Sequence, residues 1–368
     1  MQKKILYLSK NDGTDIRIGK ECRSLVAAGH QVLFVGWDRG GAGFAEDVEP
    51  LPGVEKRILR QEGGYESARV LLVFWRYLLF AWRQVLQFRP DYIQAVNEDG
   101  VIVALLCKLG LETRVVADIF DSMAFRYADK NFLLRSAVRF FSKLAWGSAY
   151  RIIVTDDERA SKFESYRDKL IVLPNYPSAP GFSPLEIKQR INRSEELQVY
   201  FGGTLNSARG LHLLEALVES PLKVKVICAG WVYDEVAQRF VDLEDVEFRG
   251  VLSAEESLRV AAESDAIFAF YEPSNLNNIM ASPNKVYDAL IVGTPLLMNS
   301  EAQISKWVVE RQLGFSSPYA DVDGILSMAE SLLLWNQQRS SHAQRLLSLS
   351  AEGYSWPAVE NRLTDIFR

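Results

Sequence analysis

The sequence predicts an α/β protein built from two Rossmann-like, doubly wound domains. Short apolar, β-rich runs alternate with stretches that carry apolar residues at helical spacing, a pattern typical of parallel sheets covered by helices. The alternation stops at a segment that contains Pro174, Pro177 and Pro180, and it then begins again. At 368 residues the chain is also longer than one hydrophobic core usually supports.

The individual elements follow from these patterns. In the first half, strands are predicted at Lys4–Leu8, Gln31–Gly36, Tyr92–Val96, Arg114–Asp118 and Arg151–Val154. In the second half, they are predicted at Leu197–Phe201, Lys223–Ala229, Val246–Phe248, Ala266–Phe270 and Pro295–Asn299. We therefore predict an N-terminal domain over residues 1–177, a linker over 178–196 and a second domain over 197–350. Ligands of such sheets bind at the carboxyl ends of the strands, so a cleft between the domains is expected.

Composition excludes several classes of protein. With 48% hydrophobic and 24% charged residues, the chain resembles ordinary soluble domains. Cys22, Cys107 and Cys228 lie far apart and form no metal-binding motif, which argues against a disulfide framework or a zinc site. The apolar segment at the N-terminus is too short for a signal peptide, and no apolar run reaches membrane-spanning length. We expect a cytoplasmic protein that binds no nucleic acid.

The segment from Ser282 to Asp288 is the most informative part of the sequence. Ser282 and Pro283 predict a helix start directly after a strand and loop, and such a start presents free N–H groups to a phosphate. Lys285 adds a positive charge, and Asp288, one turn later, adds an acceptor for hydroxyls. Together with Asn284, these residues predict a site for a diphosphate next to a ribose.

A second loop points to the same ligand. Gly202, Gly203 and Thr204 follow a predicted strand, and Arg209 lies a few residues later. Glycines allow a backbone to approach a ligand closely, and Arg can bind phosphate oxygens through two hydrogen bonds. With Lys285, Arg209 would complete a diphosphate clamp of two cations. The alternative is a solvated Arg on a flexible loop.

Loops of the first half carry candidate acceptor and catalytic residues. The loop with Gly13, Thr14 and Arg17 is either an ordinary polar turn or a substrate-contacting loop. Glu98, Asp99, Asp118 and Asp121 follow two other predicted strands. Each acid is either a helix cap or a candidate general base, and their shared edge of the sheet favours function. His30, His212 and His342 stand in no arrangement typical of a nucleophile relay.

Two predicted helices of the first half are basic and aromatic. The helix over Arg69–Arg89 has Arg76 and Arg83 on one face, and the helix over Leu133–Arg151 has Arg139 and Lys143 on one face. Residues 1–185 hold 26 basic and 22 acidic residues, whereas residues 186–368 hold 16 and 25. Either these faces bind anionic lipid headgroups, or the two helices are ordinary core helices whose basic side chains reach water.

With these residues in view, the chain resembles the GT-B glycosyltransferases of the family 4-like branch over nearly its full length. The resemblance is carried by Asp15–Arg17, Val116–Asp121, Gly202–Gly203, Arg209–Gly210, Ser282–Lys285 with Asp288, Gly293–Pro295 and Tyr354–Trp356. The last of these is similar to the family's C-terminal segment, so residues 351–368 are expected to form a helix that returns to the first domain.

The resemblance implies a UDP- or GDP-sugar donor held by the second domain, without a metal or other cofactor. Arg209 and Lys285 would then bind the diphosphate, and Asp288 the ribose. The family's paired glutamates would fall at Met280 and Asp288, and the frequent histidine at Phe120, so this chain departs from the pattern at all three positions. Retention at the anomeric carbon is usual in family 4 and is the expected outcome here.

Glu272 is a further candidate for contacts to the sugar. If the reaction inverts the anomeric carbon instead, the general base would be Glu98, Asp99, Asp118 or Asp121.

The leading hypothesis is transfer of a sugar to a lipid-linked or saccharide acceptor in bacterial envelope polysaccharide synthesis, at the inner face of the cell membrane. A non-hydrolysing nucleotide-sugar epimerase and a non-catalytic GT-B scaffold are the alternatives. A dinucleotide-dependent dehydrogenase is disfavoured because neither half opens with G-x-G-x-x-G.

Overall fold

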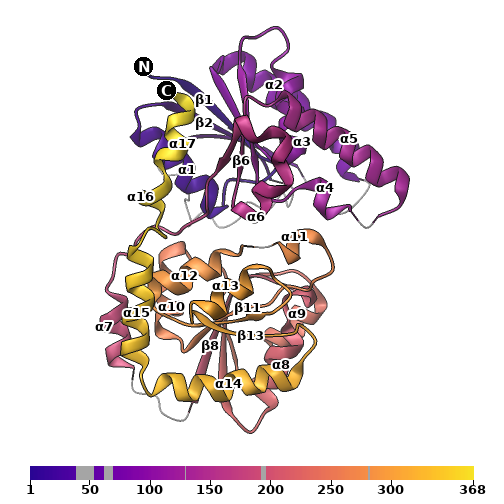
Figure 1. Cartoon of the computed structure of the whole chain (residues 1–368). Helices are drawn as coiled ribbons and strands as arrows, with labels where there is room; N and C mark the ends of the chain where they lie inside the picture. The colour runs from indigo at the N-terminus through magenta and orange to yellow at the C-terminus, as the bar shows by residue number, and fades with distance from the viewer. Residues whose placement is uncertain (39–53, 62–68, 129, 192–195, 281) are drawn as a thin grey trace. The chain divides into compact units, whose positions relative to one another are not determined.

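The structure is a computed structural model that describes residues 1–38, 54–61, 69–128, 130–191, 196–280 and 282–368. The chain forms two compact units (Figure 1). The first comprises Met1–Asn175 and Val359–Arg368, and the second comprises Tyr176–Ala358. The chain therefore leaves the first unit once and returns to it near its C-terminus.

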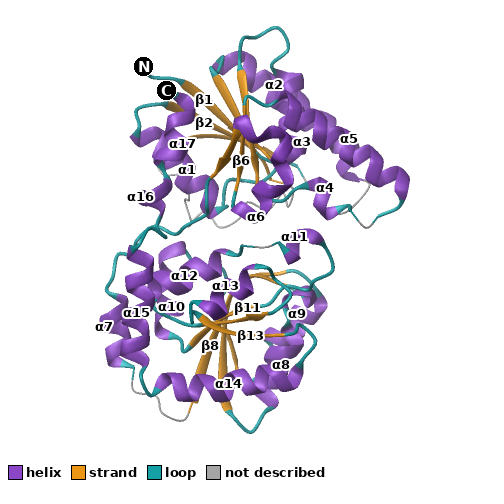
Figure 2. Ribbon diagram, viewed as in Figure 1, coloured by secondary structure: helices purple, strands orange, loops and turns teal. Residues whose placement is uncertain are grey.

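A seven-stranded parallel sheet forms the centre of the first unit (Figure 2). Its strands are β1 (Lys4–Leu8), β2 (Gln31–Asp38), β3 (Glu55–Arg60), β4 (Tyr92–Val96), β5 (Arg114–Ile119), β6 (Arg151–Val154) and β7 (Leu170–Val172). The order is β3-β2-β1-β4-β5-β6-β7. In β1, Leu6 pairs with Leu33 of β2 and with Ile93 of β4. The strand order therefore reverses between β1 and β4, the position where ligands of doubly wound sheets bind.

Helices cover both faces of this sheet. The helices are α1 (Ile16–Ala27), α2 (Arg69–Phe88), α3 (Asn97–Cys107), α4 (Met123–Arg126), α5 (Phe132–Ser148), α6 (Asp157–Ala160) and α17 (Asn361–Thr364), with 3-10 turns η1 (Ser161–Lys169) and η3 (Asp365–Phe367). Helix α3 packs against both α2 and α5, and these three share one core with Leu6 and Leu8. Helix α1 lies on the other face, where the Tyr7 hydroxyl bonds to Glu21.

The second unit repeats this plan with a six-stranded parallel sheet of order β10-β9-β8-β11-β12-β13. Its strands are β8 (Glu196–Leu205), β9 (Lys223–Val232), β10 (Val246–Phe248), β11 (Ala266–Ala269), β12 (Leu296–Asn299) and β13 (Gly314–Ser317). Here the order reverses between β8 and β11, and each face has its own hydrophobic core.

The helices of the second unit complete these cores. They are α7 (Pro184–Arg190), α8 (Leu211–Glu219), α9 (Glu235–Val241), α10 (Ala254–Glu263), α11 (Leu276–Ile279), α12 (Asn284–Val292), α13 (Ile304–Glu310), α14 (Val322–Asn336) and α15 (Arg339–Ala351), with the 3-10 turn η2 (Ser207–Arg209). One core includes side chains of α8, α9 and α14, and the other includes side chains of α10, α12, α13 and α15. Helix α16 (Trp356–Val359) carries the chain across the boundary between the units.

Two sequence-based boundaries need correction. The segment predicted as a linker contains α7, which packs against α10 and α15. Its Lys188 is buried and donates to the Ser264 carbonyl at 2.8 Å. The segment 351–368 contains no single helix: α15 ends at Ala351, and two short helices follow. Pro357, in the first turn of α16, has no amide hydrogen for a helix that would continue from further upstream.

Three strands lay outside the sequence prediction. β3 reads Glu-Lys-Arg-Ile-Leu-Arg and β13 reads Gly-Phe-Ser-Ser, so neither shows the apolar pattern of a buried strand. β7 has only three residues. All three lie at sheet edges, where one side of the strand needs no partner.

Candidate functional site

The two predicted phosphate-binding cations lie at one cavity in the second unit. The cavity, of about 70 Å³, is at the carboxyl ends of β8 and β11, where the strand order reverses. It is lined by Phe201, Gly202, Gly203, Thr204, Arg209, Phe268, Ala269, Phe270, Tyr271 and Lys285. Arg209 and Lys285, 76 positions apart in the sequence, are thus brought together by the pairing of β8 with β11.

Lys285 reaches the cavity from the first turn of α12. Its ammonium lies 3.1 Å from the Asp288 carboxylate and 5.8 Å from the centre of the Tyr200 ring. Burial by itself lowers the pKa of an ammonium, but Asp288 and Tyr200 raise the pKa of Lys285 above its ordinary value. The side chain is therefore a permanent positive charge, only 16% exposed, and Asp288 lies directly beside it.

Arg209 ends the 3-10 turn η2 and extends over an aromatic ring. Its guanidinium carbon lies 4.2 Å from the centre of the Tyr271 ring. Gly210 follows in the left-handed region, with φ of 71°, and its position is tight: a Cβ there would come within 2.8 Å of Phe270. Glycine therefore allows the chain to turn from η2 into α8 directly behind the arginine.

Glycines also shape the floor of the cavity. A Cβ at Gly202 would lie 2.4 Å from the Tyr200 hydroxyl, and one at Gly230 of β9 would lie 1.7 Å from the Gly203 carbonyl oxygen. Gly203 and Gly230 pair in the ladder with φ of 126° and 134°. The two strands approach each other closely at this point, and larger residues would separate them.

The start of α12 differs from its sequence prediction. Pro283, with ψ of 142°, is itself the residue before the helix, and the helix begins at Asn284. Ser282 makes no capping bond, because its hydroxyl pairs with the Tyr287 hydroxyl at 2.8 Å. The first turn of α12 still holds Asn284 and Lys285, so the correction moves the helix start by one residue.

Two positions before α12 bear on contact with the donor sugar: Glu272, the candidate contact, and Met280, where the family has a glutamate. Glu272 is exposed, and its backbone amide donates to the Ala208 carbonyl at 2.9 Å, beside Arg209. Met280 is 3% exposed and belongs to the interior. Of the two residues, only Glu272 presents a polar side chain to solvent.

In the first unit, Arg17 has a structural role that differs from the prediction. The guanidinium is 2% exposed, lies 2.8 Å from Glu21 and 3.0 Å from Asp118, and donates to the Leu173 carbonyl. Burial alone would lower the pKa of Arg17, but Asp118 and Glu21 raise it. The residue was predicted as a substrate contact, but burial against two carboxylates makes it part of the core of this unit.

The four candidate acids have different surroundings. Asp118 is fully buried beside Arg17, and Glu98, 1% exposed, accepts from the Ser122 hydroxyl at 2.6 Å and the Met123 amide at 3.0 Å. Burial raises the pKa of Glu98. Asp118 and Glu98 are therefore held by contacts within the unit, whereas a base must come within hydrogen-bond reach of a substrate proton. Asp99 forms an ion pair with Lys10, and Asp121 is 49% exposed.

The loop before α1 is held by its own side chains. The Gly13 amide donates to Asn11 Oδ1 at 2.9 Å, and the Thr14 hydroxyl donates to Asp12 Oδ1 at 2.7 Å. Gly13 adopts φ of 87°, in the region that favours glycine. Gly13 and Thr14 therefore keep a defined position at the reversal point of the first sheet.

Comparison with known proteins identifies the class of enzyme. Residues 12–175 match the family described as "Glycosyl transferase 4-like domain". This match over most of the first unit supports a glycosyltransferase. Solved structures extend the likeness in fold to the full length. HepE from Anabaena, in complex with UDP-glucose, has a TM-score of 0.73 at 13% identity and covers 100% of this chain and 99% of its own.

Two further solved structures share the fold. Sucrose-phosphate synthase from Thermosynechococcus elongatus has a TM-score of 0.71 at 14% identity, with 100% of this chain and 98% of that chain covered. WaaG, a glycosyltransferase involved in lipopolysaccharide biosynthesis, has a TM-score of 0.67 at 14% identity, with 99% of each chain covered. The predicted two-domain GT-B architecture is therefore confirmed. No curated protein matches in sequence.

Several residues around the candidate sites were not predicted from the sequence. Tyr200 and Tyr271 contact the two cations, and Asn97 Oδ1 accepts from the backbone amides of Phe120 and Asp121 at 2.9 and 3.0 Å. Tyr200 lies two residues before Gly202, on the same face of β8, which was an available signal. Asn97 adopts φ of 56°, a conformation that sequence alone does not reveal.

The predicted membrane-facing residues are on the surface of the first unit. Arg76 and Arg83 on α2 and Arg139 and Lys143 on α5 are all exposed. Among the residues that the structure describes, no helix is both long and apolar enough to cross a bilayer. Within the same residues, no three His, Cys, Asp or Glu side chains lie together as metal ligands would.

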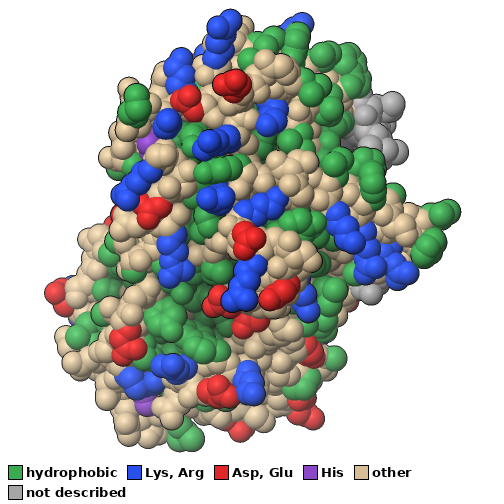
Figure 3. Space-filling view, turned by 45° about the horizontal axis from the view of Figure 1, so that its top comes forward, with side chains coloured by type: hydrophobic (Ala, Val, Ile, Leu, Met, Phe, Trp, Pro, Cys, Tyr) green, Lys and Arg blue, Asp and Glu red, His purple; other side chains and the backbone are tan. Residues whose placement is uncertain are grey.

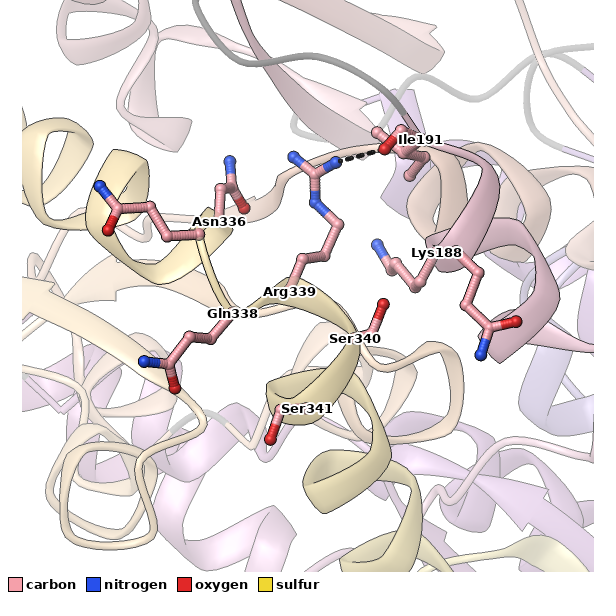
Figure 4. A pocket seen from close by; sticks show the side chains of 9 residues that line it. Lys188, Ile191, Asn336, Gln338, Arg339, Ser340 and Ser341 are labelled. Carbon is pink, nitrogen blue, oxygen red and sulfur yellow. Dashed lines mark hydrogen bonds between the residues drawn. The ribbon is translucent and has the colours of Figure 1, made fainter.

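A second cavity of the second unit, of about 340 Å³, is lined by neither Arg209 nor Lys285 (Figure 4). Arg339 donates to the Ile191 carbonyl and pairs with Asp265, and Lys188 donates to the Ser264 carbonyl. Ser264 and Asp265 precede β11, so these contacts fasten α7 and α15 to the amino end of the sheet. The two basic side chains of this cavity therefore serve the fold of the second unit.

Proposed function

We propose that this glycosyltransferase moves a sugar from a UDP-sugar to a lipid-linked or saccharide acceptor of envelope polysaccharide synthesis. The observation that carries the proposal is the meeting of Arg209 and Lys285 at one cavity, at the strand-order reversal of the second sheet. UDP is favoured over GDP because HepE, which shares the fold, is known in complex with UDP-glucose.

The proposed chemistry follows from where negative charge develops. When the bond between the anomeric carbon and the phosphate oxygen breaks, the leaving UDP gains charge on its diphosphate. Arg209 can bind two of its oxygens, and Lys285 adds a buried charge at the first turn of α12. Two cations and a helix N-terminus supply the neutralisation that a metal would otherwise give, so we propose a metal-independent reaction. Asp288 holds Lys285 through Oδ2, and we assign Oδ1 to a ribose hydroxyl.

The acceptor side is assigned to the first unit. Asp121 is the most exposed of the candidate acids there, and we propose that it orients the acceptor hydroxyl, with Gly13 and Thr14 as neighbouring contacts. We propose retention at the anomeric carbon, with Glu272 contacting the donor sugar. NMR of the product settles the stereochemistry: an inverted product would make Asp121 the general base.

A thermal-shift screen with UDP- and GDP-sugars tests the donor. The expected result is stabilisation by UDP and by at least one UDP-sugar; no stabilisation by any nucleotide would contradict the proposal and favour a non-catalytic scaffold. Incubation with the donor alone should leave the sugar unchanged, because isomerised sugar would indicate an epimerase. Labelled donor added with membrane lipids or with soluble saccharides then distinguishes the two acceptor classes.

We also propose that the outer surface of α2 and α5 docks on an anionic membrane. Large apolar side chains stand in solvent there, including Trp75 at 53%, Phe132 at 69%, Leu133 at 79% and Phe140 at 66% exposure. Figure 3 shows hydrophobic side chains beside Lys and Arg on this part of the surface. Neither helix contains an acidic residue. Exposed aromatics beside unopposed positive charge complement the interface of an anionic bilayer.

Vesicle binding tests this surface. Wild-type protein should sediment with vesicles that contain phosphatidylglycerol, less so at high salt, and Arg139→Glu/Lys143→Glu should reduce the bound fraction several-fold. The matched control, Arg190→Glu/Lys306→Glu, reverses two exposed charges of the second unit and should bind as the wild type does. Equal binding by both double variants would contradict the membrane proposal.

A further inference from the structure

The turn that carries Arg209 is held by groups from three other loops. The Ser207 amide donates to Asp234 Oδ2 at 2.8 Å, and the Ala208 carbonyl accepts from the Glu272 amide at 2.9 Å. The third contact comes from Tyr319, which follows β13. A turn of four residues is therefore fixed from several directions, although it lies on the surface of the unit.

Tyr319 makes the most specific of these contacts. Its hydroxyl accepts from the Gly210 amide at 3.1 Å and donates to the Ser207 carbonyl at 3.2 Å. One oxygen thus joins the residues at the two ends of the turn, with Arg209 between them. Burial raises the pKa of the Tyr319 hydroxyl, so the group remains protonated and keeps both of its roles at neutral pH.

Tyr319 is itself held in place. Its amide donates to both oxygens of Glu301, at 3.0 and 3.2 Å, and Glu301 also accepts from Asn299 at 3.1 Å. The His212 ring packs edge-on against the Tyr319 ring, with centroids 5.3 Å apart. The hydroxyl is therefore presented by the ends of β12 and β13, which belong to the rigid sheet.

This arrangement bears on how Arg209 can bind a diphosphate. An arginine side chain has several rotatable bonds, and ordering it on binding costs free energy. Its guanidinium is already held over Tyr271 at 4.2 Å, and the backbone behind it is held by Tyr319. Both ends of the side chain are thus fixed before a ligand arrives.

From these contacts we infer that Tyr319 is a positioning residue for donor binding: its hydroxyl fixes the turn from Ser207 to Gly210 so that Arg209 meets the diphosphate. The inference rests on the proposed function of this site and adds a residue that does not itself touch the donor. It predicts that loss of the Tyr319 hydroxyl, beyond the end of β13, weakens nucleotide binding only through its effect on Arg209.

A double-mutant cycle tests the inference by calorimetric titration with UDP. Tyr319→Phe removes the hydroxyl and keeps the ring, and it should weaken UDP binding by about 3- to 20-fold, in the range of measured couplings between neighbouring residues. In an Arg209→Ala background, the same change should have no further effect. The donor KM should rise by a similar factor, whereas the acceptor KM should not move.

The control is Tyr354→Phe, which removes a hydroxyl from the aromatic cluster with Tyr176 and Trp307 in the same unit. It should bind UDP as the wild type does. Unchanged UDP binding by Tyr319→Phe, or an equal loss in the Arg209→Ala background, would overturn the inference and leave the proposed function intact. If the wild type itself binds no UDP, the proposed function fails and the inference fails with it.

Discussion

Each of the two sheets has a cation beside carboxylates near the point where its strand order reverses, and the two units use them differently. In the first sheet, Arg17 is 2% exposed and lies between Asp118 and Glu21. In the second, Lys285 pairs with Asp288, both are 16% exposed, and the pair adjoins a cavity that also contains Arg209. A cation paired with carboxylates thus belongs to the core of one unit and to the edge of a cavity in the other. Burial and the balance of charge decide between the two roles.

The largest expected effect is on the stability of the first unit, through the buried Arg17. Arg17→Met leaves Asp118 and Glu21 without their cation, and it should lower the free energy of unfolding by about 3–5 kcal/mol. Arg209→Met, at the cavity of the second unit, should change the free energy of unfolding by no more than about 0.5 kcal/mol. Chemical denaturation measures both. Similar losses for the two variants would remove the distinction between a structural and a binding arginine.

The second prediction concerns activity. Lys285→Ala should lower turnover by about 10²- to 10³-fold, since it removes charge stabilisation of the leaving diphosphate. The control is Lys306→Ala, a lysine with 82% exposure on α13, which should retain full turnover. Near-normal turnover of Lys285→Ala, with the unfolding transition unchanged, would show that the cavity is not the donor site.

A third variant separates the acids of the first unit. Asp121→Asn should lower kcat/KM for the acceptor by about 10-fold, the value of one hydrogen bond to a charged group, without loss of stability. Asp118→Asn should instead destabilise the fold through Arg17. Acceptor kinetics and thermal unfolding of the two variants provide the test. A stable, fully active Asp121→Asn would return the search for the acceptor-orienting group to Asp99.

The smallest effect is a pH dependence. Burial raises the pKa of Glu21 well above its ordinary value, with Arg17 opposing and Asp118 adding to the shift. Glu21 therefore stabilises the fold at low pH, and this contribution is lost as pH rises from about 4.3 through the raised value. The stability of Glu21→Gln relative to wild type should increase over that window, by at most about 1.4 kcal/mol per pH unit. A difference independent of pH would show that Glu21 ionises normally.

The same comparison explains what the sequence could predict. The strands at the centre of each sheet were predicted correctly, because their apolar runs are continuous, and the loop of Arg209 and the start of α12 were recognised by their glycines, proline and cations. Arg17 and Arg209 follow strands in similar polar loops, so nothing in their local sequence separates a buried arginine from one at a cavity. That difference arises from Asp118 and Glu21, which only the folded sheet brings to Arg17.

Residues that act through distant contacts were likewise beyond sequence reasoning. Tyr319 follows β13, an edge strand without an apolar pattern, and its hydroxyl meets a turn about 110 residues earlier in the chain. Glu98 was recognised as an acid at a strand end, but its bonds to Ser122 and Met123 depend on how β4 and β5 pair. The sequence pattern places such residues at the correct edge of the sheet, but only the structure shows what they contact.

The central claim is that Arg209 and Lys285 together hold a nucleotide diphosphate. Calorimetric titration of UDP into wild type, Arg209→Ala, Lys285→Ala and the double variant tests it directly. Wild type should bind UDP, each single variant should bind about 10- to 100-fold more weakly, as expected for loss of a charge-assisted hydrogen bond, and the double variant should show no measurable binding. UDP binding of equal strength by wild type and the double variant would contradict the claim.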